Sequence, residues 1–357
     1  MRRRIWSEEV PFAVLREPRV LALLARFEVG LLVGVRPGDE TALPLVLRGC
    51  NDAGVRVGVW PMLTDAEGRW ASGRNAPSFA AFVRRIVDAA EAEGCAPAEV
   101  AFDLEPPFED LRRLLDGSGV AAGDPAGLAA RPIHGARGSV IAARAMEAGD
   151  GVLPRTGDGA GFARASRELS RLADELAARG IAASAAAIPL MLVDSCWEEL
   201  LGTPVDDPGW GHVSFMLYTS ILEGWSRGLL RRRDAVALLA EGCRVAFARY
   251  GQRAGVSLGA VGIGAFGDEP TYRDPAELAE DVGAARATGV DDLTLLDLGG
   301  VLGRPPAEPW LEAFVNTPAA CVHARPTRRA RVMLSGVFVT GRLLGALQTW
   351  RRRARLS

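Results

Sequence analysis

Lysine is absent from this chain of 357 residues, because all 42 residues counted as lysine or arginine are arginine. Schiff-base aldolases, pyridoxal-phosphate enzymes and Walker-type nucleotide-binding loops each need a lysine amine, so these classes are excluded. Histidine is also scarce, and His134, His212 and His323 stand far apart with no HxH or HExxH spacing. A histidine-based zinc site is therefore not expected, and the sequence predicts no cofactor.

Cysteine is sparse as well, with five residues that occur singly and form no CxxC pair. This pattern is typical of reduced thiols in a cytoplasmic protein rather than of a disulfide framework. The N-terminus has a basic tip at residues 2–4, but no apolar run follows it, so we expect no secretory signal. These features together predict a cytoplasmic protein.

Basic charge is not in excess, because 44 acidic residues against 42 basic ones give a net charge of −2. Proteins that bind nucleic acid usually carry a strong basic excess, so we expect no nucleic-acid partner. Hydrophobic residues make up 48% of the chain and charged residues 24%. Such a composition supplies a large buried core and excludes global disorder.

Short apolar runs alternate with amphipathic segments along most of the chain. The predicted strands are residues 4–7, 30–35, 55–63, 99–104, 181–192, 213–218, 257–266 and 292–298. The predicted helices are residues 19–27, 42–50, 78–93, 161–179, 232–250, 275–288 and 307–315. Eight strands alternating with helices predict an α/β protein of the eightfold (β/α) TIM-barrel class. The alternative is an open doubly wound sheet, but no GxGxxG sequence opens a helix.

Two segments fall outside this repeat. Residues 116–159, rich in glycine, alanine, aspartate and proline, form a long insertion after the fourth predicted strand. Because loops of this length are often functional, we expect the insertion to close over the site as a lid. The chain therefore divides into a catalytic barrel over residues 1–318 and a basic, partly apolar tail over residues 319–357.

The clearest candidate site is the pair Asp103 and Glu105, which ends the fourth predicted strand. Active sites of TIM barrels lie at the carboxyl ends of the strands. Residues two apart on a strand share a face, so both carboxylates would point into the mouth of the barrel. Crowding of two carboxylates in a partly dry site raises one pKa and keeps a neutral acid available near pH 7.

Five tryptophans lie at or just after predicted strand ends, namely Trp6, Trp60, Trp70, Trp197 and Trp225. Indole rings pack against the C–H faces of sugars, while nearby carboxylates accept hydrogen bonds from the hydroxyl groups. Glu8 after the first strand and Asp297 after the eighth are the acids we expect to serve in this way. The sequence therefore predicts a carbohydrate substrate.

These motifs resemble those of the family-18 chitinase-type glycoside hydrolases, through Asp103-x-Glu105 and the Met216-Leu217-Tyr218 that ends the sixth strand. The resemblance implies that Glu105 is the proton donor, that Asp103 orients the acetamido group of the substrate and that Tyr218 contacts that group. The family's two earlier aspartates on the fourth strand are Ala98 and Ala101 here.

A second resemblance is to the clan A retaining glycosidases, through Glu105-Pro106 at the end of the fourth strand. It implies that Glu105 is the acid/base and that a glutamate near the end of the seventh strand, here Glu269, is the nucleophile. In a retaining enzyme the two carboxyl groups would lie roughly 5–5.5 Å apart, against roughly 6.5–9.5 Å in an inverting one. The sequence leaves the stereochemical outcome open.

Two other functions stay open at this point. Asp103, Glu105, Glu269 and Asp297 are oxygen ligands of the kind that Mg²⁺ or Mn²⁺ prefers, which would suit a metal-dependent sugar isomerase or lyase. Alternatively, the replaced aspartates at positions 98 and 101 indicate a carbohydrate-binding or scaffold barrel without catalysis. The identity of the sugar and the oligomeric state are not predicted.

The tail places an apolar stripe between two arginine clusters, at residues 328–331 and 351–353. The stripe consists of Val332, Met333, Leu334, Val337, Phe338, Leu344 and Leu347. Its longest apolar run ends at Arg342 and is too short to span a bilayer about 30 Å thick. Three alternatives follow: a helix packed on its own barrel, an oligomer contact, or a peripheral helix over residues 328–353 on an anionic membrane.

Overall fold

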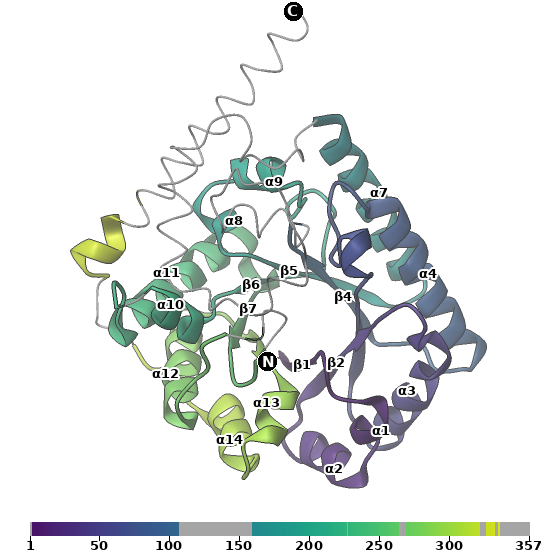
Figure 1. Ribbon diagram of the computed structural model, residues 1–357, viewed down its shortest axis with the longest axis horizontal. Coiled ribbons are helices and arrows are strands. Elements are labelled where there is room, and N and C mark those ends of the chain that lie inside the picture. The colour runs from purple at the N-terminus through teal and green to yellow at the C-terminus, as the bar shows by residue number, and fades with distance from the viewer. Residues whose placement is uncertain are drawn as a thin grey trace, which may run out of the picture.

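The computed structural model describes residues 2–106, 159–226, 228–263, 267, 269–321, 326–332 and 335, and these form a closed barrel of eight parallel strands (Figure 1). The strands are β1 (Arg2–Ser7), β2 (Gly30–Val35), β3 (Val57–Pro61), β4 (Glu99–Leu104), β5 (Ala182–Ala187), β6 (His212–Met216), β7 (Ala254–Gly259) and β8 (Asp292–Leu296). Each strand pairs with the next, and the pairing of β1 with β8 closes the ring. The prediction of an eightfold (β/α) barrel is therefore confirmed.

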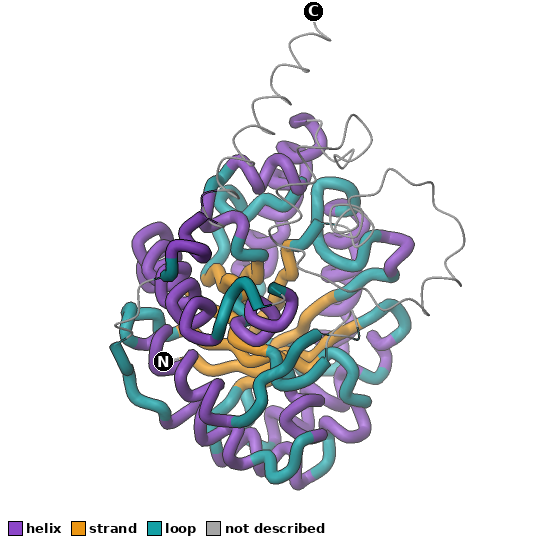
Figure 2. The backbone as a smooth tube through the Cα atoms, turned by 60° about the vertical axis from the view of Figure 1, so that its left-hand side comes forward, coloured by secondary structure: helices purple, strands orange, loops and turns teal. Residues whose placement is uncertain are grey.

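Helices enclose the strands on the outside, as Figure 2 shows in purple around orange. They are α1 (Phe12–Leu15), α2 (Pro18–Arg26), α3 (Leu43–Asp52), α4 (Ala76–Ala92), α7 (Gly159–Ala178), α8 (Leu190–Val193), α9 (Cys196–Leu201), α10 (Thr219–Trp225), α11 (Arg232–Tyr250), α12 (Pro275–Arg286), α13 (Leu298–Gly303) and α14 (Glu308–Asn316). Asp274 caps α12 by accepting hydrogen bonds from the backbone N–H groups of Ala276 and Glu277, as its position before Pro275 predicts.

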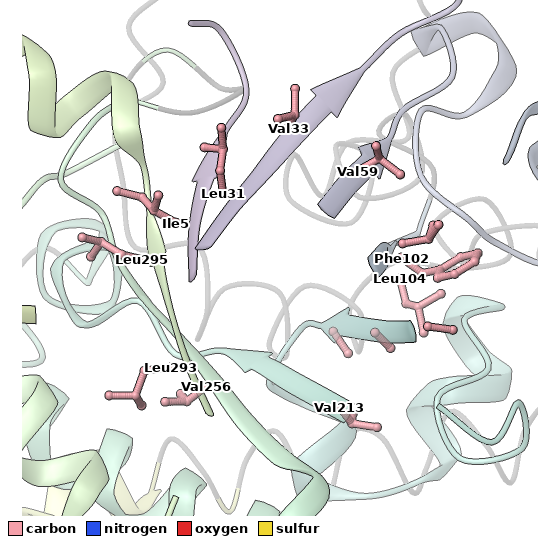
Figure 3. Close-up of a cluster of buried hydrophobic side chains, with 14 of the residues drawn as sticks. Ile5, Leu31, Val33, Val59, Phe102, Leu104, Val213, Val256, Leu293 and Leu295 are labelled. Atoms are coloured by element: carbon pink, nitrogen blue, oxygen red, sulfur yellow. The ribbon is translucent and has the colours of Figure 1, made fainter. Parts of the chain in front are cut away.

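Alternation along each strand separates an outer core from an inner one. The outward side chains, among them Ile5, Val33 and Phe102, pack under the helices in a ring around the barrel (Figure 3). The inward side chains include Trp6, Trp60 and the small residues of β4 and β5. Because both faces are buried, the strands appear in the sequence as nearly continuous apolar runs.

The amino end of the barrel interior is filled by charged side chains instead of apolar ones. Arg4 pairs with Glu99, and its Nη2 lies 2.6 Å from Asp292 Oδ1. Arg2 Nη2 lies 2.5 Å from Glu99 Oε2, and His212 Nδ1 lies 3.1 Å from Asp292 Oδ2. This end of the barrel lies opposite the strand ends that carry active sites, so we assign this network to stability.

Several predicted boundaries were wrong. The fifth strand ends at Ala187, not residue 192, because α8 begins at Leu190 directly after Pro189. The seventh runs over Ala254–Gly259 instead of residues 257–266. Beyond it, the backbone N–H of Ala260 donates to Ser220 Oγ instead of continuing a strand ladder. Helix α4 starts at Ala76 after Asn75, so Ser78 lies inside its first turn.

Helix α7 resumes the repeat after the segment that follows β4, and Figure 1 shows it beside α4. Arg84 of α4 contacts Glu175 and Glu168 of α7 at 2.7 Å and 3.2 Å. The predicted insertion at residues 116–159 lies outside the described residues except for Gly159, which begins α7. Its role as a lid, and the division of the chain at residue 318, stay predictions.

The start of the tail packs on the barrel. Ala330 is fully buried against Leu230, Leu238 and Leu222 from the region of α10 and α11. The backbone N–H of Thr327 donates to Asp234 Oδ1 at 3.3 Å, while Val332 is exposed. The rest of the apolar stripe lies outside the described residues. Across the described part of the chain, no helix combines the length and the apolar character that crossing a membrane requires.

Candidate active site at the carboxyl end of the barrel

Asp103 and Glu105 enter the barrel mouth from the end of β4. Phe102 and Leu104 pack in the outer core, so Asp103 between them faces inward. Asp103 is only 4% exposed, and Glu105, at the next inward position, is partly exposed. The predicted carboxylate pair on one face of β4 therefore lies where the strand ends toward solvent.

Burial and the charges of neighbouring acids raise the pKa of both carboxyl groups. Burial raises the pKa of Asp103 most, and the charges of Glu105 and Glu8 raise it further. The pKa of Glu105 is raised to about 8, first by burial and then by the charge of Glu8, with Arg69 acting in the opposite direction. The pair therefore retains a proton at neutral pH, which is what a general acid requires.

Glu8 reaches the same mouth from the end of β1. It is 8% exposed, and its Oε1 lies 3.1 Å from Arg69 Nη1 and 3.6 Å from Arg36 Nη2. Burial raises the pKa of Glu8 to about 6, an effect that Arg69 and Arg36 partly offset. Glu8 thus has a lower pKa than Glu105, although the sequence identified Glu8 only as a substrate-binding residue.

Trp6 and Trp60 line the barrel interior beneath these acids. Their ring centroids lie 4.7 Å apart, and both side chains are at least nine-tenths buried. Trp6 Nε1 donates to Ser257 Oγ at 3.4 Å. The indole N–H of Trp60 favours the charged form of Asp103, but neither Trp60 Nε1 nor Asp103 Oδ1 has a hydrogen-bond partner in the described structure. The two rings are therefore packed against each other at an interplanar angle of 56° inside the barrel, with Trp60 near Asp103.

Tyr218 lies between the end of β6 and the start of α10. A Cβ added at Gly259 of β7 would lie 3.2 Å from Tyr218 Cδ1, so glycine there leaves room for the ring. Burial raises the pKa of the Tyr218 hydroxyl well above its usual value, and the charges of Asp103 and Glu105 raise it further. Tyr218 thus belongs to the same electrostatic cluster and keeps its proton for donation.

The loop after β3 supplies a cation that sequence reasoning missed. Arg69 adopts a left-handed backbone conformation (φ 45°), and its Nε donates to Asp65 Oδ1 at 2.6 Å. A turn with a Thr64–Glu67 capping box precedes it, and this T-x-x-E sequence is the one local signal that could have predicted the turn. The backbone N–H of Ala71 donates to the Asp103 carbonyl at 3.1 Å, which holds Trp70 and Arg69 beside β4.

Asp297 at the end of β8 has a structural role of its own. Its Oδ1 accepts from Gly300 N at 2.9 Å and its Oδ2 from Gly299 N at 3.2 Å, so it caps α13. Burial raises its pKa, and its charge contributes to the shifts at Glu8 and Tyr218. Asp297 therefore lies near the site with both carboxylate oxygens already engaged.

The structure does not bring every predicted residue to this cluster. Trp197 is 3% exposed and packs in the outer core with Leu200 and Leu201 on α9. Trp225 is partly buried at the end of α10. Glu269 is buried ten residues beyond the end of β7 and is not among the charges that shift the pKa of Glu105. Its role as a nucleophile stays a prediction.

Among the described residues, no three histidine, cysteine, aspartate or glutamate side chains come close enough together to hold a metal ion. The acids at the mouth come from the ends of three strands, with Glu8 after β1, Asp103 and Glu105 at the end of β4, and Asp297 after β8.

No known protein family matches the sequence of this chain, and no curated protein matches it either. Solved structures do share the fold. The glycoside hydrolase domain of PgaB (BpsB) from Bordetella bronchiseptica has a TM-score of 0.50 and 13% identity, covering 88% of this chain and 99% of that chain.

Two further likenesses are weaker. A GH5_18 protein from Bifidobacterium longum in complex with Manb1-4GlcNAc has a TM-score of 0.46 and 10% identity, covering 94% of this chain and 78% of that chain. A D-psicose 3-epimerase, solved in the presence of D-fructose, has a TM-score of 0.41 and 13% identity, covering 97% of this chain and 100% of that chain. At such identities the likeness extends to the TIM-barrel fold alone.

Proposed function

We propose that this protein is a carbohydrate-active enzyme that hydrolyses a glycosidic bond with Glu105 as its general acid. The observation that carries the proposal is the position of Glu105 directly after β4, beside the buried Asp103, where burial raises the pKa of Glu105 to about 8. Glycoside hydrolases require an acid of raised pKa that protonates the leaving oxygen. The TIM-barrel fold that the chain shares with a glycoside hydrolase domain is compatible with this chemistry.

The neighbouring residues have complementary roles in this proposal. Asp103 is the neighbour that keeps a proton in the pair, because the charge of an ionised Glu105 raises the pKa of Asp103. The hydroxyl of Tyr218 donates a hydrogen bond that orients the substrate. Trp6 and Trp60 provide the apolar floor on which a sugar ring packs.

Hydrolysis of an oligosaccharide panel tests the proposal. The wild-type protein should release reducing ends from at least one member of the panel. Glu105→Gln should lower kcat by about a hundred-fold to ten-thousand-fold, the usual contribution of general acid catalysis. The matched control is Glu93→Gln, which changes an exposed glutamate paired with Arg48 on the surface and should leave kcat unchanged. Full activity in Glu105→Gln would contradict the proposed role.

A further inference from the structure

Glu8 occupies a position that its assignment as a simple sugar-binding acid does not explain. Side chains of β1 point alternately into and out of the barrel, and Arg4 and Trp6 point inward. Glu8, which follows the last strand residue Ser7, is the next position on the inner side. A Cβ added at Gly34 of β2 would lie 3.0 Å from the carbonyl oxygen of Ser7 and 3.4 Å from Glu8 Cα. Glycine at position 34 therefore relieves crowding where β2 passes the end of β1.

Glu8 faces charged groups from every neighbouring element. Arg69 and Arg36 contact its carboxylate from the loops after β3 and β2, and Arg36 Nη2 also lies 2.5 Å from Glu9 Oε1. The other charges that act on it are Glu9 and Asp297. Its own charge acts in turn on Asp103, Glu105 and Tyr218. Glu8 is therefore electrostatically linked to the proposed acid while two guanidinium groups favour its ionised form.

We propose that Glu8 is a second catalytic carboxylate, the base that activates water while Glu105 protonates the leaving oxygen. This inference rests on the proposed glycosidase function. It is carried by the placement of the two carboxyl groups on β1 and β4, which are not neighbouring strands of the ring. Glu8 is assigned as the base because two guanidinium groups contact its carboxylate. Glu105 is assigned as the acid because no ion pair joins it to an arginine among the described residues.

Proton affinities agree with that assignment. Between pH 6 and pH 8 Glu8 is mostly ionised and Glu105 mostly protonated, since their pKa values are raised to about 6 and about 8. Pairs of carboxyl groups whose surroundings separate their pKa values mark the base and the acid of a hydrolase. The pKa of Asp103 is also raised, first by burial and then by the charges of Glu105 and Glu8.

The step balances without any further reagent. Water attacks the anomeric carbon, and its proton passes to the Glu8 carboxylate as the new C–O bond forms. The bond from the anomeric carbon to the leaving oxygen breaks, the electron pair stays on that oxygen, and the proton of Glu105 neutralises it. The products are a sugar with a new anomeric hydroxyl group and the leaving group with its free hydroxyl, and transfer of one proton from Glu8 to Glu105 through solvent restores the site. The water attacks from the side opposite the leaving group, so the anomeric configuration inverts.

Kinetics of Glu8→Gln distinguish a base from a binding residue. The proposal predicts a fall in kcat of about a hundred-fold or more, a nearly unchanged KM, and loss of the acidic limb of the pH profile near pH 6. The control is Glu93→Gln, a change at an exposed glutamate that pairs with Arg48 away from the site, and it should retain both the rate and the limb. A rise in KM with the acidic limb retained would overturn the proposal.

A second measurement needs no substrate, so it separates failure of this inference from failure of the hydrolase function. Carboxyl carbon NMR of glutamate-labelled protein follows the titration of Glu105, assigned by its disappearance in Glu105→Gln. Because the charge of Glu8 raises the pKa of Glu105, Glu8→Gln should lower it, whereas Glu9→Gln should not. An unchanged Glu105 titration in folded Glu8→Gln would show that the two groups do not face each other.

Discussion

Arg69 reaches Glu8 from a backbone conformation that side chains rarely adopt. Its Nη1 lies 3.1 Å from Glu8 Oε1 while its φ is 45°. Left-handed backbone conformations at residues other than glycine carry a cost and concentrate at functional sites. The guanidinium also lies 5.7 Å from the Trp70 ring centroid, which fixes its direction. Arg69 is therefore held in place as a counter-charge to the acids of the mouth.

Arg69→Gly is the informative substitution, because glycine tolerates the left-handed conformation and removes only the side chain. Loss of the guanidinium should raise the pKa of Glu8 and Glu105, since Arg69 lowers both. Both limbs of the pH–rate profile should therefore move to higher pH. Arg48→Gly lacks any contact with the site and is the control for the loss of an arginine. Unshifted limbs in Arg69→Gly would show that Arg69 does not tune the site.

The raised pKa values also predict that the site lowers the stability of the fold. A carboxyl group with a raised pKa binds more protons in the folded state, so the free energy of unfolding falls as pH rises from the unfolded value, about 4.3, toward the folded one. For Glu105 this window extends to about pH 8. Glu105→Gln should therefore stabilise the protein at pH 8 by on the order of 1 kcal/mol, a figure reduced for partial exposure.

Urea denaturation of wild type and Glu105→Gln at pH 5 and pH 8 measures this effect. The stabilisation should be larger at pH 8 than at pH 5, because the wild-type carboxyl group keeps its proton at the lower pH. Equal differences at the two pH values, or a destabilised variant at pH 8, would mean that the proton affinity of Glu105 is not raised in the folded protein.

The fold could be predicted from the sequence because a barrel strand is buried on both faces. Residues 30–35 and 99–104 were placed without error: the first is a short apolar run typical of a covered parallel strand, and the second is mostly apolar between Glu99 and Asp103. The fifth strand was extended too far, because Ile188 and Leu190 continue the apolar pattern while the chain already turns at Pro189. Hydrophobicity alone does not distinguish the end of a strand from a short buried helix.

The candidate site could be predicted in part. Asp103 and Glu105 were predicted on one face because residues two apart on a strand share it, whereas Tyr218 was proposed from the Met216-Leu217-Tyr218 resemblance. Arg69 could not be found, because its direction depends on a positive φ and on contacts with Asp65 and Glu8. Trp197 illustrates the converse, because a tryptophan after a strand end packs equally well under a surface helix such as α9.

The charged network at the amino end of the barrel should matter for stability and not for chemistry. Arg4→Met removes the cation that pairs with both Glu99 and Asp292, which are at most 4% exposed. Breaking a buried ion pair from one side costs about 3–5 kcal/mol. The pKa of Asp292 is lower in the folded protein than in the unfolded chain. Its contribution to stability is therefore present at pH values above the unfolded-state pKa and is lost as the pH falls through the folded-state pKa.

Chemical denaturation at pH 7 measures the Arg4→Met effect. The folded fraction should keep its kcat, because the site lies at the opposite end of the strands. The exposed Arg48–Glu93 pair is the control, and Arg48→Met should cost about 0–1 kcal/mol. A variant as stable as wild type would show that the network contributes little.

The buried Ala330 at the start of the tail predicts how this segment is held. It packs on Leu230 and Leu238, so Ala330→Arg would place a charge among apolar side chains and detach the first turn. The variant should be cut by trypsin after residues 328–331 faster than wild type, while the barrel stays intact. Arg331→Lys keeps a cleavage site at an exposed position and is the control. The rate of local cleavage follows the free energy of local opening. Equal cleavage rates in Ala330→Arg and in wild type would therefore mean that this packing does not protect the tail.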